Sequence, residues 1–140
     1  MTAVAAADCA LCATRDTPAI WCDARLRVIT AAHPDYPGFL RVIWHAHVRE
    51  MTDLEPADRE HCLLVVFAVE RALRDTLRPD KINVASLGNQ VPHVHWHVIP
   101  RFADDAHFPE PVWAAKQRDG TAHPLDVGQI RARLTRVLGA

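Results

Sequence analysis

Apolar side chains recur along this chain with two different periods, and the changes of period predict where the elements begin and end. Leu26–Ala31 and Phe39–Trp44 are short runs rich in β-branched and aromatic residues, which is typical of strands. From Pro56 to Pro79, apolar residues instead return every three or four positions, and this spacing predicts one long helix. We expect Phe67 to widen the buried face of that helix.

A predicted hairpin follows the long helix. Lys81–Ser86 and His93–Ile99 are strand candidates joined by the short segment 87–92, so the two strands should pair antiparallel. Pro100 should end the second strand, because proline cannot donate to a ladder. Strands, then one long helix, then a hairpin together indicate an α+β domain with an antiparallel sheet.

The last forty residues predict an irregular stretch and then a helix. Residues 103–120 should lack regular structure, because two prolines interrupt them. Asp126 followed by Gln129 resembles a capping box and predicts the start of a C-terminal helix. That helix carries an apolar stripe formed by Ile130, Leu134, Val137 and Leu138.

The composition narrows the class of protein. With 140 residues, the chain has the size of one domain, and we expect residues 1–140 to form it. A net charge of -1 gives no long-range attraction to a nucleic-acid polymer or to an acidic membrane. There is no signal peptide pattern and no apolar run that would span a bilayer. We therefore expect a cytoplasmic protein, whose four cysteines stay reduced.

Three of the nine histidines alternate within five positions. In a strand, His93, His95 and His97 share one face, and the apolar residues between them pack against the core. A solvated face would explain a single histidine better than three in strict alternation. The three histidines can hardly share one metal ion, because the Cα atoms of His93 and His97 would lie roughly 13 Å apart along the strand. The remaining interpretation is a division of labour, with a neutral His95 imidazole attacking phosphorus.

The run His93-Val94-His95-Trp96-His97-Val98-Ile99 resembles the signature of the histidine-triad family of nucleotide hydrolases and transferases. Gly88 lies five residues before the run, as the loop glycine of that family does. The segment Val42–Leu54 is similar to the family's strand that leads into the long helix. The resemblance covers about residues 9–102, so residues 103–140 would be a C-terminal extension. It implies an antiparallel sheet of about five strands with one long helix and a C-terminal helix.

The resemblance also implies roles for individual residues. His95 would attack the α-phosphorus of a nucleotide and become a nucleotidyl-histidine, while His97 would contact the phosphate oxygens beside it and His93 would complete the triad. The implied substrate-binding residues are Asn83, Gly88, Asn89 and Gln90. The implied substrate is an adenosine nucleotide, such as a dinucleoside polyphosphate or an adenosine phosphoramidate. The resemblance further implies a homodimer and a reaction that needs no metal.

The segment before the triad departs from the family pattern. The loop between Asn83 and His93 is one residue shorter than usual, and Gln90 stands where a small hydroxyl residue is common. Pro92 removes a backbone donor immediately before the triad. These departures leave the choice of substrate open.

Cys9 and Cys12 have the spacing of half a zinc site. In histidine-triad relatives that bind zinc, the partner ligands resemble His47 and His93 here. The resemblance therefore implies a structural zinc ion held by these four residues. Two reduced cysteines without a metal are the alternative, whereas a thioredoxin-like redox role is disfavoured because no βαβ pattern surrounds the pair.

Two further functions remain open on the same sequence. One is a nucleotide-binding or partner-binding protein without turnover, and the other is a metal-dependent hydrolase that uses His95 and His97 as ligands. The segment Phe102–Ala115, which contains Phe108 and Trp113, could lie over the site or pack against the sheet. We expect it to pack against the sheet.

Overall fold

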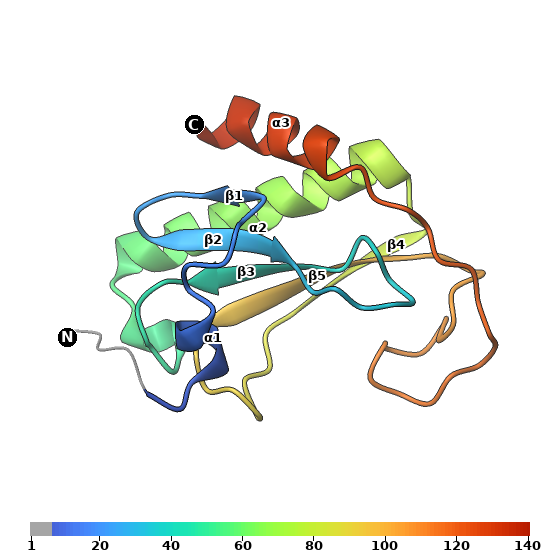
Figure 1. The fold of residues 1–140 in the computed structure, drawn as a ribbon, viewed down its shortest axis with the longest axis horizontal. Coiled ribbons are helices and arrows are strands. Elements are labelled where there is room, and N and C mark those ends of the chain that lie inside the picture. Colours follow the sequence, from blue (N-terminus) through green and yellow to red (C-terminus); the bar gives the residue numbers. More distant parts are fainter. Residues whose placement is uncertain (1–6) are drawn as a thin grey trace.

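Five strands form one antiparallel sheet in the computed structural model, which describes residues 7–140 (Figure 1). Side by side, the strands are β1 (Trp21–Cys22), β2 (Leu26–Thr30), β3 (Leu40–Trp44), β5 (His95–Arg101) and β4 (Lys81–Ala85). The helices are α1 (Ala10–Ala13), α2 (Pro56–Leu77) and α3 (Val127–Leu138), with a 3₁₀ turn, η1, at Met51–Asp53. The predicted α+β fold with a five-stranded antiparallel sheet is confirmed.

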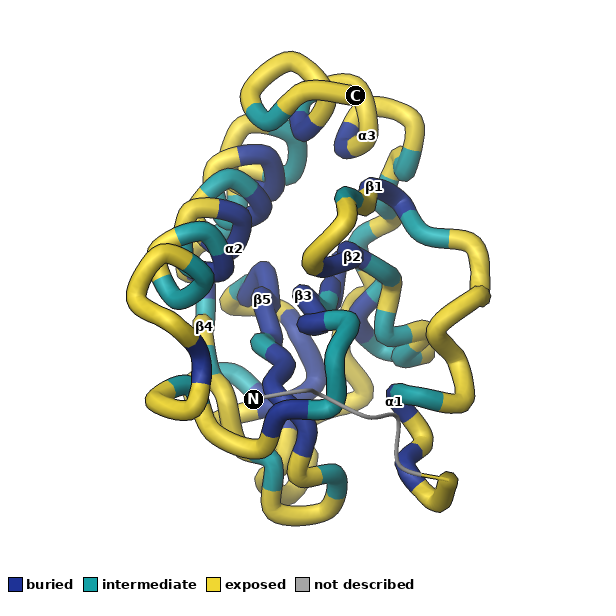
Figure 2. Tube along the Cα trace, turned by 90° about the vertical axis from the view of Figure 1, so that its left-hand side faces the viewer, coloured by how far each residue is buried: buried dark blue, intermediate teal, exposed yellow. Residues whose placement is uncertain are grey.

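Helices α2 and α3 cover one face of the sheet, and the main core lies between them and the strands (Figures 1 and 2). The strands contribute alternate residues to this core, among them Val42 and Val98. Helix α2 contributes a stripe at helical spacing, Val65, Val66, Val69 and Leu73. Asp126 accepts a hydrogen bond from the backbone N–H of Gln129, which confirms the predicted N-terminal cap of α3.

The opposite face of the sheet carries the histidines of β5. In the register of β3 with β5, Arg41 lies opposite His97 and Ile43 opposite His95, so all four side chains belong to this second face. Short helix α1 covers one end of it, where Cys9 and Leu11 pack against Ile43. The sheet therefore separates an apolar core on one side from a polar, histidine-bearing surface on the other.

The second hairpin strand differs from its prediction at both ends. It begins at His95 and not at His93, and it runs through Pro100 to Arg101. Proline is accommodated because β3 pairs with β5 only as far as Val98, so β5 has a ladder partner on one side only at Pro100.

Two residues predicted to be buried on helices face outward. Phe67 on α2 is 57% exposed and Val137 on α3 is 67% exposed, so neither side chain enters the core. Periodicity identified these helices correctly but overestimated the width of their buried faces. No helix within residues 7–140 is long and apolar enough to cross a membrane.

Candidate functional site

The four predicted zinc ligands lie close together beside helix α1. The ligating atoms of Cys9, Cys12, His47 and His93 all lie within 4.8 Å of one another. Each cysteine Sγ lies 3.5–3.6 Å from a histidine Nδ1, and the Nδ1 atoms of His47 and His93 are 3.2 Å apart. A tetrahedral zinc site with ordinary bond lengths has S···N edges of about 3.5 Å and N···N edges of about 3.3 Å. The four residues therefore fit a Cys₂His₂ zinc site.

Hydrogen bonds outside this cluster hold its members in place. The Nε2–H of His93 donates to the carbonyl oxygen of Trp44 at 2.6 Å, which leaves Nδ1 as the free ligand atom. Burial lowers the pKa of His93 below its usual value, so the ring is neutral as a metal ligand must be. The buried Arg27 donates to the carbonyl oxygen of Leu11 at 2.6 Å and so fixes the turn between the two cysteines.

His95 is oriented by the residue two positions before it. Its Nδ1–H donates to the carbonyl oxygen of His93 at 2.6 Å. The proton is thereby placed on Nδ1, and Nε2 carries the lone pair. Burial, together with the nearby charge of Arg41, lowers the pKa of His95. The side chain is thus a neutral imidazole with one aimed, unprotonated nitrogen, which is what a nucleophile toward phosphorus requires.

His97 lies beside His95, and both residues line the same cavity. The two rings are 5.0 Å apart and nearly perpendicular. The Nδ1 of His97 is buried and has no hydrogen-bond partner within residues 7–140. Burial, with smaller contributions from His95 and Arg41, lowers the pKa of His97 to about 4. An imidazole with unused hydrogen-bonding capacity is suited to a ligand that has still to bind.

A cavity of about 280 Å³ opens over His95 and His97. The loop 87–91 forms one wall, so Gly88, Asn89 and Gln90 lie where the sequence predicts substrate-binding residues. Gly88 has a φ of +78°, a left-handed conformation that glycine adopts without strain. This size suits a small-molecule ligand, and the loop provides amide donors toward it.

Two further lining residues are not among the predicted substrate-binding residues. Arg41 lines the cavity from β3, next to His97. Trp113 lines it from the irregular segment, with its ring 5.2 Å from that of His97 and 52% of the residue exposed. The prediction that this segment packs against the sheet is therefore wrong for Trp113. It is correct for Val112, which is buried with Tyr36 and Ile99.

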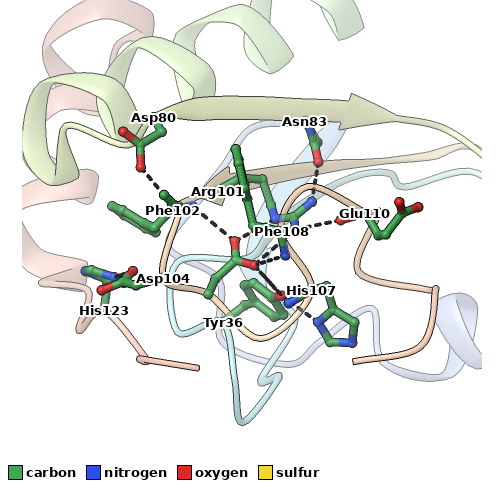
Figure 3. A network of polar contacts seen from close by, with 12 residues as sticks. Tyr36, Asp80, Asn83, Arg101, Phe102, Asp104, His107, Phe108, Glu110 and His123 are labelled. Carbon is green, nitrogen blue, oxygen red and sulfur yellow. Dashed lines mark hydrogen bonds and ion pairs between the residues drawn. The ribbon is translucent and has the colours of Figure 1, made fainter. Parts of the chain in front are cut away.

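A buried ionic network holds the segment that carries Trp113 (Figure 3). Arg101 and Asp105 form a two-pronged ion pair of 2.8 and 3.1 Å, and Arg101 also donates to the carbonyl oxygen of Glu110. Burial alone would raise the pKa of Asp105, but hydrogen bonds from Arg101 and from backbone N–H groups outweigh it and hold that pKa well below its usual value. The hydroxyl of Tyr36 donates to Asp105 and lies 2.6 Å from Nδ1 of His107.

The structure does not bring every predicted residue to the cavity. Asn83 lies on the histidine-bearing face of β4, but its amide oxygen accepts a hydrogen bond from Arg101 at 2.8 Å and its side chain does not line the cavity. His93 likewise belongs to the metal cluster and not to the cavity wall. The triad is thus divided between two neighbouring sites.

The family follows from the match to known proteins. The family model of the HIT domain matches residues 14–104, which contain the whole histidine run. This chain belongs to the histidine-triad (HIT) family. A histidine-triad protein from Bradyrhizobium japonicum has the same fold, with a TM-score of 0.70 and 31% identity over 90% of this chain and 93% of that chain. The predicted family membership is confirmed.

Two further relatives bear on the site of this HIT protein. A zinc-bound histidine-triad family protein from Mycobacterium smegmatis has a TM-score of 0.65 and 26% identity over 92% of this chain and 94% of that chain. An AP-4-A phosphorylase from Mycobacterium tuberculosis is 33% identical over 84 residues, which cover 54% of this chain. The match spans only 42% of the phosphorylase, so it extends to less than half of that enzyme.

Proposed function

We propose that this HIT protein is a nucleotide hydrolase or nucleotidyl transferase in which His95 forms a covalent nucleotidyl-histidine. The observation that carries the proposal is the orientation of His95 by the carbonyl oxygen of His93, with the ring lining a cavity large enough for part of a nucleotide. The similarity to an AP-4-A phosphorylase supports a nucleotide phosphoanhydride as the substrate class. Dinucleoside polyphosphates and adenosine phosphoramidates are the substrates that we propose to test first.

The proposed reaction has two displacements at the same phosphorus. In the first, the lone pair on Nε2 of His95 attacks the α-phosphorus, and the bond to the leaving oxygen or nitrogen breaks with its electron pair. In the second, water or another acceptor attacks that phosphorus, the N–P bond breaks back to Nε2, and the attacking group releases its proton. His97 and the loop residues Gly88, Asn89 and Gln90 would contact the phosphoryl oxygens, where negative charge builds up.

The cysteine–histidine cluster fits zinc, and we propose that it has a structural role. A zinc ion bound by Cys9, Cys12, His47 and His93 would add folding stability and leave no coordination position open for water. In this account His93 positions its neighbour through its backbone, while His95 and His97 act on the substrate. The reaction itself needs no metal. The homodimer and the cytoplasmic location stay predictions.

Turnover by matched histidine variants tests the proposal. We would follow consumption of a diadenosine polyphosphate and an adenosine phosphoramidate by the wild-type protein, His95→Ala and His123→Ala. His123 contacts Asp104 and Phe102 and does not line the cavity, so its variant controls for the loss of a histidine as such. We expect His95→Ala to lose at least about a thousandfold in rate and His123→Ala to retain it.

Two results would favour the other functions. If the wild-type protein binds these nucleotides but consumes none of them, the chain is a binding protein and the proposed activity is wrong. If a chelator stops turnover without unfolding the protein and no nucleotidyl adduct forms on the wild-type protein, the metal-dependent hydrolase that uses His95 and His97 as ligands replaces the proposal.

A further inference from the structure

Arg41 places a permanent positive charge in the wall of the histidine cavity. It is the register partner of His97 on the neighbouring strand, and sheet alternation directs its side chain to the polar face while Val42 enters the core. Arg41, His95 and His97 all line the cavity. The guanidinium carbon of Arg41 lies over the ring of Phe39, and that ring is in edge contact with the ring of His97.

Among the residues that the structure describes, this cation has no counter-charge of its own. Within residues 7–140, no carboxylate lies within ion-pair distance of Arg41, and no hydrogen bond from its guanidinium is present. Its Nε is buried without an acceptor among these residues, and its guanidinium carbon lies 5.7 Å from the centre of the Phe39 ring. By comparison, Arg101 on the same face of the sheet is fully paired with Asp105. A partly buried guanidinium without an anion or a hydrogen-bond acceptor destabilises the fold, and a bound anionic ligand would supply both.

The remaining lining residues leave the cavity positive. None of the residues that line it carries a carboxylate. The loop 87–91, which also lines the cavity, contains the side-chain amides of Asn89 and Gln90. A cavity with one cation, amide donors and no acid is complementary to an anion, and a planar guanidinium matches the geometry of phosphate.

We propose that Arg41 is a phosphate ligand of this cavity, a binding residue that contacts the nonbridging oxygens of the substrate's phosphate beside His97. The inference deepens the proposed function, on which it rests for the identity of the ligand as a nucleotide. The fixed charge would act on the substrate phosphate and also on the extra negative charge that builds up during each displacement at phosphorus.

The test compares two ligands that differ only in the phosphate. Affinities for AMP and for adenosine would be measured by calorimetry with wild type, Arg41→Met, Arg41→Lys and Arg49→Met. Arg49 is a matched control, since its side chain is 73% exposed and its ion pair is with Glu50. We expect Arg41→Met to weaken AMP binding about 10–100-fold and to leave adenosine binding within about twofold. Arg41→Lys should keep part of the affinity for AMP, and Arg49→Met should keep all of it.

Thermal unfolding separates a ligand role from a structural one. Because the buried Nε of Arg41 has no acceptor, Arg41→Met should keep or raise the midpoint of unfolding, whereas removal of a structural arginine would lower it. If Arg41→Met does not fold, Arg41→Lys and Arg41→Gln carry the same comparison of the two ligands.

Three outcomes would overturn the proposal. They are unchanged AMP affinity in Arg41→Met, an equal loss for AMP and adenosine, and a wild-type protein that binds neither AMP nor inorganic pyrophosphate. Failure of the proposed function is distinguishable, because AMP binding requires no turnover. If Arg41→Met loses affinity for AMP while His95→Ala keeps full activity, Arg41 is still a phosphate ligand but the covalent mechanism is wrong.

Discussion

The Nδ1 of His95 lies 2.6 Å from the carbonyl oxygen of His93. One residue thus serves two sites, because the side chain of His93 belongs to the cysteine–histidine cluster and its backbone orients the proposed nucleophile. The cluster and the cavity are adjacent, and displacement of His93 would misdirect His95. Under the proposed function, this relationship would couple metal binding at the cluster to catalysis at His95 without placing a metal in the reaction.

Removal of one cysteine of the cluster should therefore affect both stability and rate. We expect Cys12→Ser to lose bound zinc, to lower the midpoint of thermal unfolding and to slow turnover, because His93 is no longer held. Zinc content by elemental analysis, calorimetry and the turnover assay measure the three effects. Cys22→Ser is the control, since Cys22 is exposed and outside the cluster. Wild-type protein that is stable, active and free of zinc would contradict this prediction.

The buried ion pair of Arg101 with Asp105 should be highly sensitive to substitution. Asp105→Asn leaves the buried guanidinium without its anion, and we expect a loss of roughly 3–5 kcal/mol in the free energy of unfolding. Asp75→Asn, at an exposed pair with Arg71 and Arg133, should change it by less than about 1 kcal/mol. Urea denaturation at pH 7 checks both, and equal effects would show that burial of the pair is unimportant.

The same carboxylate should make stability depend on acid. The pKa of Asp105 is lower in the folded than in the unfolded protein, so its contribution is complete above about pH 4 and is lost as the pH falls toward the folded pKa. Urea denaturation at pH 7, 4 and 3 gives the free energy of unfolding of wild type and of Asp105→Asn. The difference between the two proteins should become smaller as the pH falls. A constant difference between the two proteins would contradict the lowered pKa.

His97 should stay neutral well into the acid range. Burial, with contributions from His95 and Arg41, lowers its pKa to about 4, whereas an unfolded chain titrates at about 6.5. The unfolded chain therefore binds the extra proton between these values, and His97 contributes a loss of stability as the pH falls from about 6.5 to 4. NMR of the His97 ring, identified by its absence in His97→Asn, should give a midpoint near 4. A midpoint at or above 6.5 would show that the ring is not buried.

Trp113 and its neighbour Val112 should separate binding from stability. Trp113 is half exposed over His97, so Trp113→Ala should weaken nucleotide binding about 5–50-fold and change the free energy of unfolding by less than about 1 kcal/mol. Val112 is buried, and Val112→Ala should instead lower stability by about 1–2 kcal/mol. Trp113→Phe should recover part of the affinity. Undiminished nucleotide binding by Trp113→Ala would show that the ring does not contact the ligand.

The spacing of apolar residues predicts the helices and strands of this protein well. An element that is buried on one face has apolar residues at regular intervals in the sequence. The alternation around His95 and the helical spacing from Pro56 onward identified β5 and α2, and spacing with resemblance identified the cluster of Cys9 and Cys12. The start of β5 was misplaced because nothing local distinguishes His93, which points toward the cluster, from a residue inside the strand.

The cavity wall was harder to predict, because residues distant in the sequence form it. Arg41 lies within an apolar run, and only its register opposite His97 reveals which face it occupies. Trp113 belongs to a segment without periodicity, which the ion pair of Arg101 and Asp105 positions (Figure 3). Pairing between strands and a buried ionic network decide both placements, and neither leaves a period in the sequence.

The intact mass of the protein during turnover shows whether His95 carries the nucleotide as a covalent adduct. Wild type, His95→Ala and the control His123→Ala would each be mixed with an adenylylated substrate and stopped in base, in which a phosphoramidate survives. We expect an added adenylyl mass on wild type and on His123→Ala, its loss in acid, and no adduct on His95→Ala. An adduct of the same size on His95→Ala would contradict the assignment of His95 as the nucleophile.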